Sequence, residues 1–197
     1  CSAAKAFLTP NLSRPNLKVI THAVSAKVTL EGRRATGVAY HQGGALQTVQ
    51  ARREVILSAG AFGSPQLLQL SGIGTAADLQ KLGIPVAHDL PGVGRNLQDH
   101  IDYVQTWRVP SHTDTFGVSL RGSARVTGAM LEWKNKRTGM VTSSIATCGA
   151  FFRSSPEVAI PDLQLVFVLG IVDDHARKMH LGHGISCHVD LLRPHSR

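Results

Sequence analysis

Histidine and aspartate, the side chains that most often hold metal ions or move protons, gather in one late segment of the chain. Six of them lie close together in sequence: Asp173, Asp174, His175, His180, His183 and His188. Neutral imidazoles and carboxylates ligate zinc and iron, so this segment could build a metal centre. Its spacing contains no pair of histidines at i and i+4 on one helix face. A metal-dependent enzyme therefore stays an alternative, and no metal ligand is assigned.

A second chemical pattern consists of small residues. Residues 60–74 read Gly-Ala-Phe-Gly-Ser-Pro-Gln-Leu-Leu-Gln-Leu-Ser-Gly-Ile-Gly and follow an apolar run. That run predicts a strand at 54–58 that is covered on both faces. Ser64 is a good N-cap and Pro65 suits the first helical position, so a helix is predicted from there to residue 70. Such a strand, turn and helix let a flat or phosphorylated ligand approach closely, although a well-capped turn needs no ligand.

Residues 60–74 resemble the second signature of the glucose-methanol-choline (GMC) oxidoreductases, which are FAD-dependent alcohol oxidases and dehydrogenases. Every restricted position of that signature is matched: Gly60, Ala61, Ser64, Pro65, Leu67, Leu68, Ser71, Gly72, Ile73 and Gly74. Similar order and spacing continue in residues 82–86 and 90–100, and precede the signature in 2–8 and 14–17. The resemblance is strong over roughly the first half of the chain. Within the family, the chain is most similar to bacterial choline-dehydrogenase-like and aliphatic-alcohol dehydrogenases.

The resemblance implies oxidation of an alcohol to an aldehyde by hydride transfer to the flavin, with a histidine as general base. In the family, this histidine and the Gly-x-Gly-x-x-Gly turn that holds the FAD pyrophosphate flank the part that this sequence resembles. Neither is found here, since Gly92-Val93-Gly94 continues as Arg95-Asn96-Leu97. We therefore expect an internal fragment of a longer flavoenzyme, with no catalytic residue in this chain. A non-catalytic binding module that kept the fold is a further alternative.

The resemblance also implies which residues bind the FAD: Val24, Ala59, Gly60 and Asn96. Val24 would contact the adenine through its backbone, Ala59 and Gly60 would lie beside the ADP moiety, and Asn96 would stand in a loop near the flavin. From the residues alone, Val24 also suits a core strand, Ala59 and Gly60 a tight turn, and Asn96 a helix N-cap. His100 is expected to be structural, because the family's catalytic histidine falls outside this chain.

The predicted elements give a mixed α/β chain (α+β overall) in two parts. Residues 1–100 are expected to form part of a Rossmann-like FAD-binding domain with a β-meander. Residues 101–197 are expected to form part of a substrate domain with an antiparallel sheet. The patterns predict strands at 16–30, 35–40, 45–51, 101–109, 163–169 and 184–192, and helices at 65–70, 76–82 and 119–137.

Composition narrows the function classes further. The net charge of +8 is spread over short basic groups and the aromatic content is 5%, which argues against a nucleic-acid partner. Three widely separated cysteines build no disulfide or metal framework, so a reducing compartment is expected. No apolar stretch approaches the length of a membrane span. The expected partners are an alcohol and an electron acceptor, oxygen or a quinone. The expected location is cytoplasmic or peripheral to the inner membrane, with membrane contact left open.

Overall fold

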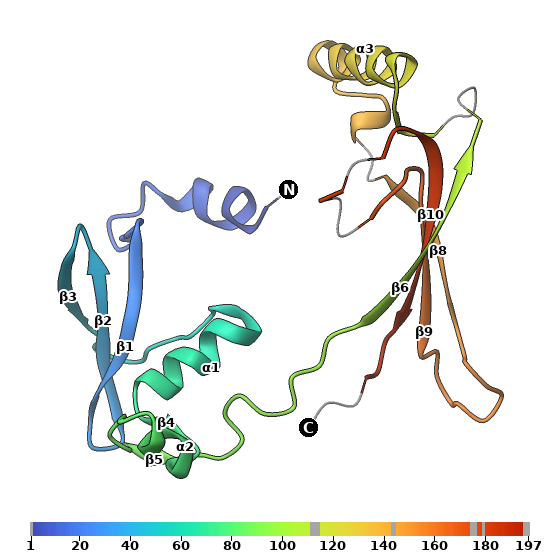
Figure 1. Ribbon diagram of the computed structural model, residues 1–197. Coiled ribbons are helices and arrows are strands. Elements are labelled where there is room, and N and C mark those ends of the chain that lie inside the picture. The colour runs from blue at the N-terminus through green and yellow to red at the C-terminus, as the bar shows by residue number, and fades with distance from the viewer. Residues whose placement is uncertain (1, 111–114, 143–144, 174–176, 179, 195–197) are drawn as a thin grey trace. The chain divides into compact units, whose positions relative to one another are not determined.

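The computed structural model describes residues 2–110, 115–142, 145–173, 177–178 and 180–194. The chain forms two compact units, residues 1–97 (unit 1) and residues 98–196 (unit 2) (Figure 1). Unit 1 carries a three-stranded meander and a short parallel pair, and unit 2 carries a five-stranded sheet. The mixed α/β fold predicted from the sequence is confirmed.

The sheet of unit 1 is an antiparallel meander of three consecutive strands. They are β1 (Ala23–Glu31), β2 (Arg34–Gln42) and β3 (Ala45–Gln50), paired in that order. Gly32 and the Gly43–Gly44 pair adopt positive φ angles in the two connecting turns, where glycine is favoured. The predicted first strand starts too early. His22 has φ of 54°, and this left-handed residue interrupts the extended chain just before Ala23.

The helices of unit 1 come before and after this meander in the chain, and α1 contacts β1. They are η1 (Ala4–Leu8), η2 (Thr9–Asn11), α1 (Gly60–Leu70) and α2 (Ala76–Lys81), and the short strands β4 (Ile73–Gly74) and β5 (His88–Asp89) pair in parallel. Helix α1 begins at Gly60, so its predicted start at Ser64 or Pro65 is wrong. Ser64 acts from within the helix, where its Oγ accepts the Ala59 N–H at 3.0 Å. The predicted ends are right: Gly72 and Gly83 follow the two helices with positive φ.

The strand predicted at 54–58 is not formed. This segment is irregular, and none of the described strands pairs with it. The side chain of Ile56 is 76% exposed, which is far from the two-sided burial that the apolar run predicts. An apolar run becomes a strand only where a neighbouring strand supplies hydrogen-bond partners, and the described residues of this chain supply none.

Helix α1 is fastened to strand β1 by one serine. The Val28 N–H donates to Ser71 Oγ at 2.8 Å, and the Ser71 hydroxyl donates to the Leu67 carbonyl at 2.6 Å. Val28 and Leu67, whose backbone groups make these two hydrogen bonds with Ser71, are both buried. This joint fixes the end of α1 against the meander.

Unit 2 is built on a sheet whose path runs β6, β10, β9, β8, with a fifth short strand beside β10. The strands are β6 (Ile101–Val109), β7 (Gly117–Val118), β8 (Ala146–Phe152), β9 (Leu163–Val168) and β10 (Gly182–Leu191), and every pairing is antiparallel. Helix α3 (Leu120–Lys136) lies near one end of this sheet and is followed by η3 (Met140–Thr142) (Figure 1). The strands predicted at 101–109, 163–169 and 184–192 and the helix at 119–137 match to within two residues. Strand β8 was not predicted.

A buried histidine ties α3 to the sheet. Ser119 is the N-cap of α3, and its Oγ accepts the Gly122 N–H at 3.0 Å. The Ser119 hydroxyl also lies 2.7 Å from Nε2 of His183, while His183 Nδ1 lies 3.2 Å from the Thr115 carbonyl. A carbonyl can only accept, so Nδ1 carries the proton and Nε2 accepts from Ser119. Gly122 and Ala129 are the buried residues of α3, and the Ser119–His183 contact gives the start of the helix a polar anchor.

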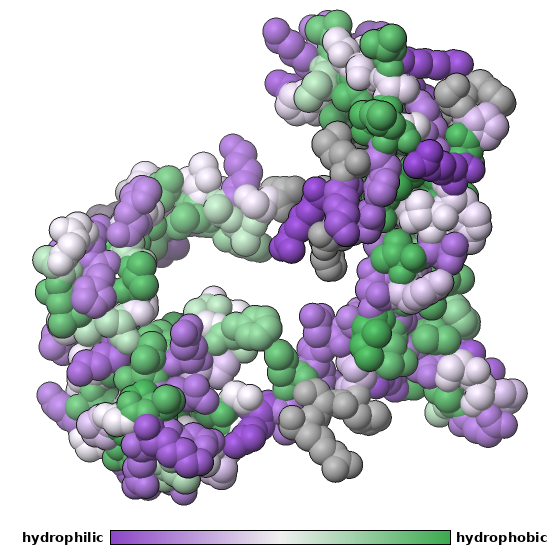
Figure 2. Space-filling view, viewed as in Figure 1, coloured by the Kyte–Doolittle hydropathy of each residue, from purple (hydrophilic) through white to green (hydrophobic). Residues whose placement is uncertain are grey.

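The apolar core is thin in both units. The buried apolar residues of the described chain are Val28, Ala39, Leu67, Leu79, Ala129, Val168 and Cys187. Figure 2 shows apolar residues lying between polar ones on the visible surface of both units. Large exposed apolar areas mark surfaces that another surface covers. None of the helices within the described ranges is both long enough and apolar enough to cross a bilayer.

Candidate functional site

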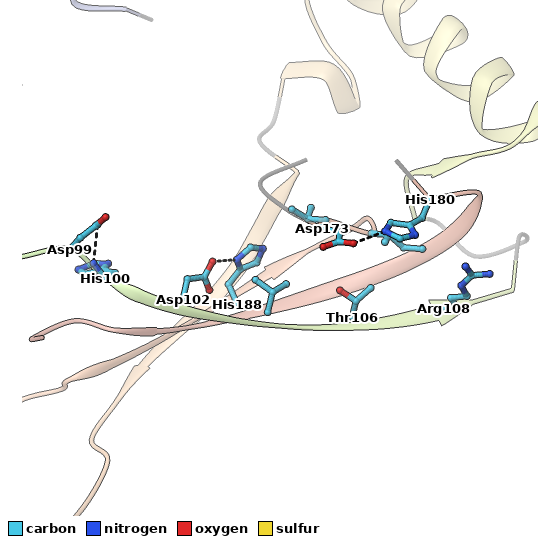
Figure 3. Close-up of a pocket in the computed structure, with 11 residues that line it drawn as sticks. Asp99, His100, Asp102, Thr106, Arg108, Asp173, His180 and His188 are labelled. Atoms are coloured by element: carbon cyan, nitrogen blue, oxygen red, sulfur yellow. Dashed lines mark hydrogen bonds and ion pairs between the residues drawn. The ribbon is translucent and has the colours of Figure 1, made fainter. Parts of the chain in front are cut away.

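The clearest cavity with chemical groups lies on one face of the unit 2 sheet (Figure 3). Its volume is about 690 Å³. Its walls combine acidic, imidazole and apolar side chains: Asp99, His100, Asp102, Val104, Thr106, Arg108, Ile171, Val172, Asp173, His180 and His188. The cavity is therefore a polar site with one apolar side.

Strand geometry explains why these residues share one face. Side chains alternate between the two faces of a strand, so Asp102, Val104, Thr106 and Arg108 of β6 all point the same way. The antiparallel register places Val104 opposite His188 of β10 and Asp102 opposite Asp190. Two strands far apart in the sequence thus bring one histidine and two carboxyl groups together.

The closest polar contact in the cavity joins His188 and Asp102. His188 Nδ1 lies 2.7 Å from Asp102 Oδ2, and the two side chains are 18% and 25% exposed. An ionised carboxylate can only accept hydrogen bonds, so Nδ1 carries a proton and donates it. This contact selects the tautomer of the neutral ring and holds its orientation.

Asp190 adds a second carboxyl group next to this pair. Burial and the neighbouring charge of Asp102 raise the pKa of Asp190 above its ordinary value, and a hydrogen bond between the two carboxyl groups adds to the rise. His100 and His188 act in the opposite direction. The strand register thus places Asp190 beside Asp102, which in turn contacts His188.

A second histidine–aspartate pair lines the same cavity. His180 Nε2 lies 2.8 Å from Asp173 Oδ2, and these side chains are 36% and 45% exposed. Figure 3 shows both pairs standing on the same side of the β6 and β10 ribbons. The second pair is more open to water than the first, so its geometry is less firmly held.

Ser186 holds the edge of the cavity in place. It is fully buried in β10, where its Oγ donates to the Gly170 carbonyl and accepts the Val172 N–H, both at 2.9 Å. The Thr106 hydroxyl lies 3.2 Å from the same oxygen. These contacts fix the segment after β9, which contributes Ile171 and Val172 to the apolar side of the cavity.

Among the described residues, the late histidines are not brought together as a metal centre would require. His183 is bonded to Ser119 and Thr115 instead of lying with the other histidines. His180 and His188 each contact a different aspartate. Within the described ranges, no group of three or more His, Cys, Asp or Glu side chains is arranged so that it could hold a metal ion. Asp174 and His175 lie outside those ranges.

The four residues predicted to bind a cofactor all lie in unit 1 and are all exposed. Val24 is near the start of β1 and is 70% exposed, so it is not a core valine. Ala59 and Gly60 form the start of α1, where Gly60 has φ of 80° and open space around it. Asn96 has φ of 54° and no helix follows it, so it is not an N-cap. Among the described residues, no hydrogen bond joins any of these four to another.

Sequence reasoning missed the pairing of Asp102 with His188. His100, which was expected to be structural, also lines this cavity. The usable signal was the alternation of polar residues along two predicted strands, at 102, 106 and 108 and at 186, 188 and 190. That alternation indicates a polar sheet face, but it does not give the register that makes the contact.

The family model described as GMC oxidoreductase matches residues 1–102. The chain belongs to the GMC oxidoreductase family. This confirms the family indicated by residues 60–74, and it places the meander and α1 within the matched part.

Relatives match over almost the entire chain. The alcohol dehydrogenase [acceptor] of Pseudomonas putida is 44% identical over 100% of this chain and 36% of its own length. The oxygen-dependent choline dehydrogenase of Pectobacterium carotovorum is 41% identical over 100% of this chain and 35% of its own. Human mitochondrial choline dehydrogenase is 44% identical over 98% and 32%. This GMC chain thus spans about a third of the length of the curated relatives it matches.

Solved structures agree with this assignment. A variant of the Aspergillus oryzae RIB40 formate oxidase, studied for its FAD modification, superposes with a TM-score of 0.80 at 28% identity, over 92% of this chain and 36% of that one. Pyridoxine 4-oxidase superposes with a TM-score of 0.70 at 24% identity, which supports the fold alone. Both units of the GMC chain are therefore parts of the family's fold.

Proposed function

We propose that this chain is an internal segment of an FAD-dependent enzyme that oxidises an alcohol to an aldehyde by hydride transfer to the flavin. The observation that carries the proposal is 44% identity to an alcohol dehydrogenase over the whole chain, together with membership of the GMC family. The thin cores and exposed apolar side chains of both units support it, because a larger enzyme would cover them.

Unit 1 would form part of the FAD-binding domain, at about residues 1–100. The surroundings of the residues predicted to bind FAD fit this cofactor. β1 is an edge strand, so part of its backbone is open, and Val24 could contact the adenine through its own backbone groups. Around Gly60 there is open space, and Ala59 carries only a methyl group, so the ADP moiety could approach both closely. Asn96 would stand near the flavin.

Unit 2, at about residues 101–197, would form part of the substrate side. When bound, the flavin supplies the hydride acceptor. The residues of this chain would then bind the alcohol, orient its carbinol carbon and exclude water from the cavity. Val104, Ile171 and Val172 provide an apolar wall, and His188 and Asp102 provide hydrogen bonds. The general base would come from outside this chain.

The test is made on the full-length protein. It should purify with the absorbance spectrum of a bound flavin and should reduce an artificial electron acceptor when alcohols are added. A series of primary alcohols of increasing length, together with choline and sugars, would identify the preferred substrate. A colourless protein that turns over none of these alcohols would contradict the proposal.

The same proposal leaves two natural electron acceptors to compare, oxygen and a quinone. The names of the relatives include both an acceptor-dependent and an oxygen-dependent enzyme. Oxygen uptake and quinone reduction, measured side by side with the same alcohol, would separate the two. A quinone lies in a membrane, so quinone reduction together with sedimentation on vesicles would support peripheral contact. Oxygen uptake without vesicle binding would oppose it.

A further inference from the structure

Helix α3 carries large apolar side chains on the face that points away from the rest of unit 2. Its buried residues, Gly122 and Ala129, are seven positions apart and therefore share one face of the helix. Leu120 and Leu131 fall on the nearly opposite face, and they are 94% and 56% exposed. These leucines define an outer apolar row that unit 2 itself does not cover.

The apolar surface continues past the start of the helix. Val118 and Leu181 pair in an isolated β-bridge, and the side chain of Leu181 is 76% exposed. Leu120 follows Val118 by only two residues, so these side chains come from neighbouring parts of the fold. Figure 2 shows apolar groups lying between polar ones at the end of unit 2 that carries α3.

Basic side chains accompany the outer apolar row. Residues 120–137 contain one acid, Glu132, whose carboxylate accepts from the Thr138 hydroxyl at 3.1 Å. The same segment contains five basic residues: Arg121, Arg125, Lys134, Lys136 and Arg137. By the helical repeat, the first two and Lys136 fall on one side of the row and Lys134 falls on the other. Helix α3 is therefore both apolar and positively charged along its exposed length.

Strand β3 is the other kind of exposed apolar surface in this chain. Leu46 and Val49 are 60% and 47% exposed there, but Ala45–Gln50 contains no charged residue. The core of a protein interface is depleted in charged residues, so β3 suits a surface that the rest of a larger enzyme covers. Covering α3 in the same way would bury several cations, and each would need a partner. Anionic headgroups above acyl chains satisfy both kinds of side chain at once.

We propose that α3 docks on an anionic lipid bilayer, with its outer apolar row among the acyl chains and its basic residues at the headgroups. Trp133 is 43% exposed, and tryptophan is enriched at the headgroup level of membranes. Arg137 lies over its ring, with Cζ 4.5 Å from the ring centroid. Lys134 can reach the headgroups while its methylene chain stays on the apolar side. This inference goes beyond the proposed function, because docking requires neither flavin nor turnover.

The first test measures the charge contribution by sedimentation of the full-length protein with vesicles. Binding should be strong with phosphatidylglycerol, weak with phosphatidylcholine, and reduced by salt. Arg121→Gln combined with Lys136→Gln should weaken phosphatidylglycerol binding by about 25-fold, since each cation near the surface contributes about fivefold. Arg33→Gln combined with Arg34→Gln removes the same charge from exposed positions of unit 1 and should change binding little. An equal loss in both double variants would overturn the role of α3.

The second test measures the apolar contribution. Leu131→Gln keeps a good helix former but removes the apolar group, so binding should weaken by about tenfold. Leu46→Gln makes the same change at a similarly exposed position of β3 and should leave vesicle binding unchanged. Unchanged binding of Leu131→Gln would show that the row does not enter the bilayer. Stronger binding of the unmodified protein to a DNA duplex than to these vesicles would assign the basic residues to another partner and overturn the proposal.

Oxidation of Met130 reports directly where α3 lies. Met130 is 58% exposed, so dilute hydrogen peroxide should convert it to the sulfoxide in the vesicle-free protein, as peptide mass spectrometry measures. Phosphatidylglycerol vesicles should slow this reaction at least fivefold, and phosphatidylcholine vesicles should not. A Met130 that is already unreactive without vesicles would show that another part of the enzyme covers α3, and the proposal would fail. Flavin content and alcohol turnover, measured on the same samples, test the proposed function separately.

Discussion

The two candidate sites of this chain are built in opposite ways. The predicted cofactor surface of unit 1 consists of backbone and small residues, with Gly60 at φ of 80° and open space around it. The cavity of unit 2 consists of side chains that meet across strands, with His188 and Asp102 at 2.7 Å. A backbone surface depends on local conformation, whereas a side-chain site depends on the register of distant strands.

This difference has a consequence for mutation. In unit 1, adding a methyl group at one glycine changes the surface itself, and few other side chains can compensate. In unit 2, His188 pairs with Asp102 and His180 with Asp173, so removing one member of a pair leaves the other unsatisfied. The predictions below test each unit by the kind of change to which it should be most sensitive.

The largest effect is expected when the chain is separated from the rest of the proposed enzyme. Residues 1–197 alone should bind FAD weakly or not at all and should oxidise no alcohol. This sequence holds no Gly-x-Gly-x-x-Gly turn for the pyrophosphate. Loss of a general base alone costs a factor of about 10²–10⁴ in rate. Flavin absorbance and acceptor reduction, compared with the full-length protein, measure both losses. A yellow fragment with steady turnover would refute the internal-segment assignment.

The next effect concerns the polar anchor of unit 2. Ser119→Ala removes the N-cap of α3 and the donor to buried His183 Nε2. The opening free energy of α3 should fall by about 2 kcal/mol, from a lost cap and an unsatisfied ring nitrogen. Hydrogen exchange of residues 120–136 in the full-length protein should therefore speed up by about thirtyfold. Ser123→Ala, on the exposed side of the same helix, is the control. Equal exchange in the two variants would show that the anchor does not hold α3.

The corresponding change in unit 1 is Gly60→Ala. Its φ of 80° is unfavourable for alanine and should cost about 1 kcal/mol in stability. Gly43→Ala, in the turn before β3, carries similar strain at φ of 58° and also has open space around it. Both variants should melt at similarly lowered temperatures. Only Gly60→Ala should weaken FAD binding to the full-length protein, by about tenfold, because its methyl group blocks close approach of the backbone. Equal FAD affinity in both would remove Gly60 from the cofactor surface.

The sequence predicted the parts of the fold that depend on local signals. Turns at Gly32 and Gly43, the helix end at Gly72 and the start of α3 after Ser119 all follow from residue preferences within a few positions. The strand at 54–58 failed because its pairing partners are not local. The helix start at Ser64 failed because that serine accepts a backbone N–H from inside the first turns.

The two candidate sites also differ in whether local sequence signals could predict them. The family could be predicted from small residues at fixed spacing, and the cofactor role of Ala59 and Gly60 stays a prediction. The His188–Asp102 pair could not, because its members are far apart in the sequence and meet only through the register of β6 and β10. A single-residue slip would turn one of them to the other face of the sheet.

The smallest expected effect is a pH dependence that comes from Asp190. Its pKa in the folded protein is raised, by burial first and by the charge of Asp102 next, while His100 and His188 lower it. The folded state therefore binds more protons than the unfolded state between the ordinary aspartate pKa and the raised one. Stability must then decrease as pH rises through this window, and the penalty is complete above the raised pKa.

Asp190→Asn removes the titrating group while keeping the shape of the side chain. Relative to the unmodified protein, this variant should melt at an increasingly higher temperature as the pH rises from below the ordinary pKa to neutrality. Asp162 provides the opposite case, since hydrogen bonds from Ser154 lower its pKa. Asp162→Asn should lose stability relative to the unmodified protein as the pH rises. The same sign of change in both variants would show that the pKa of Asp190 is not raised in the folded protein.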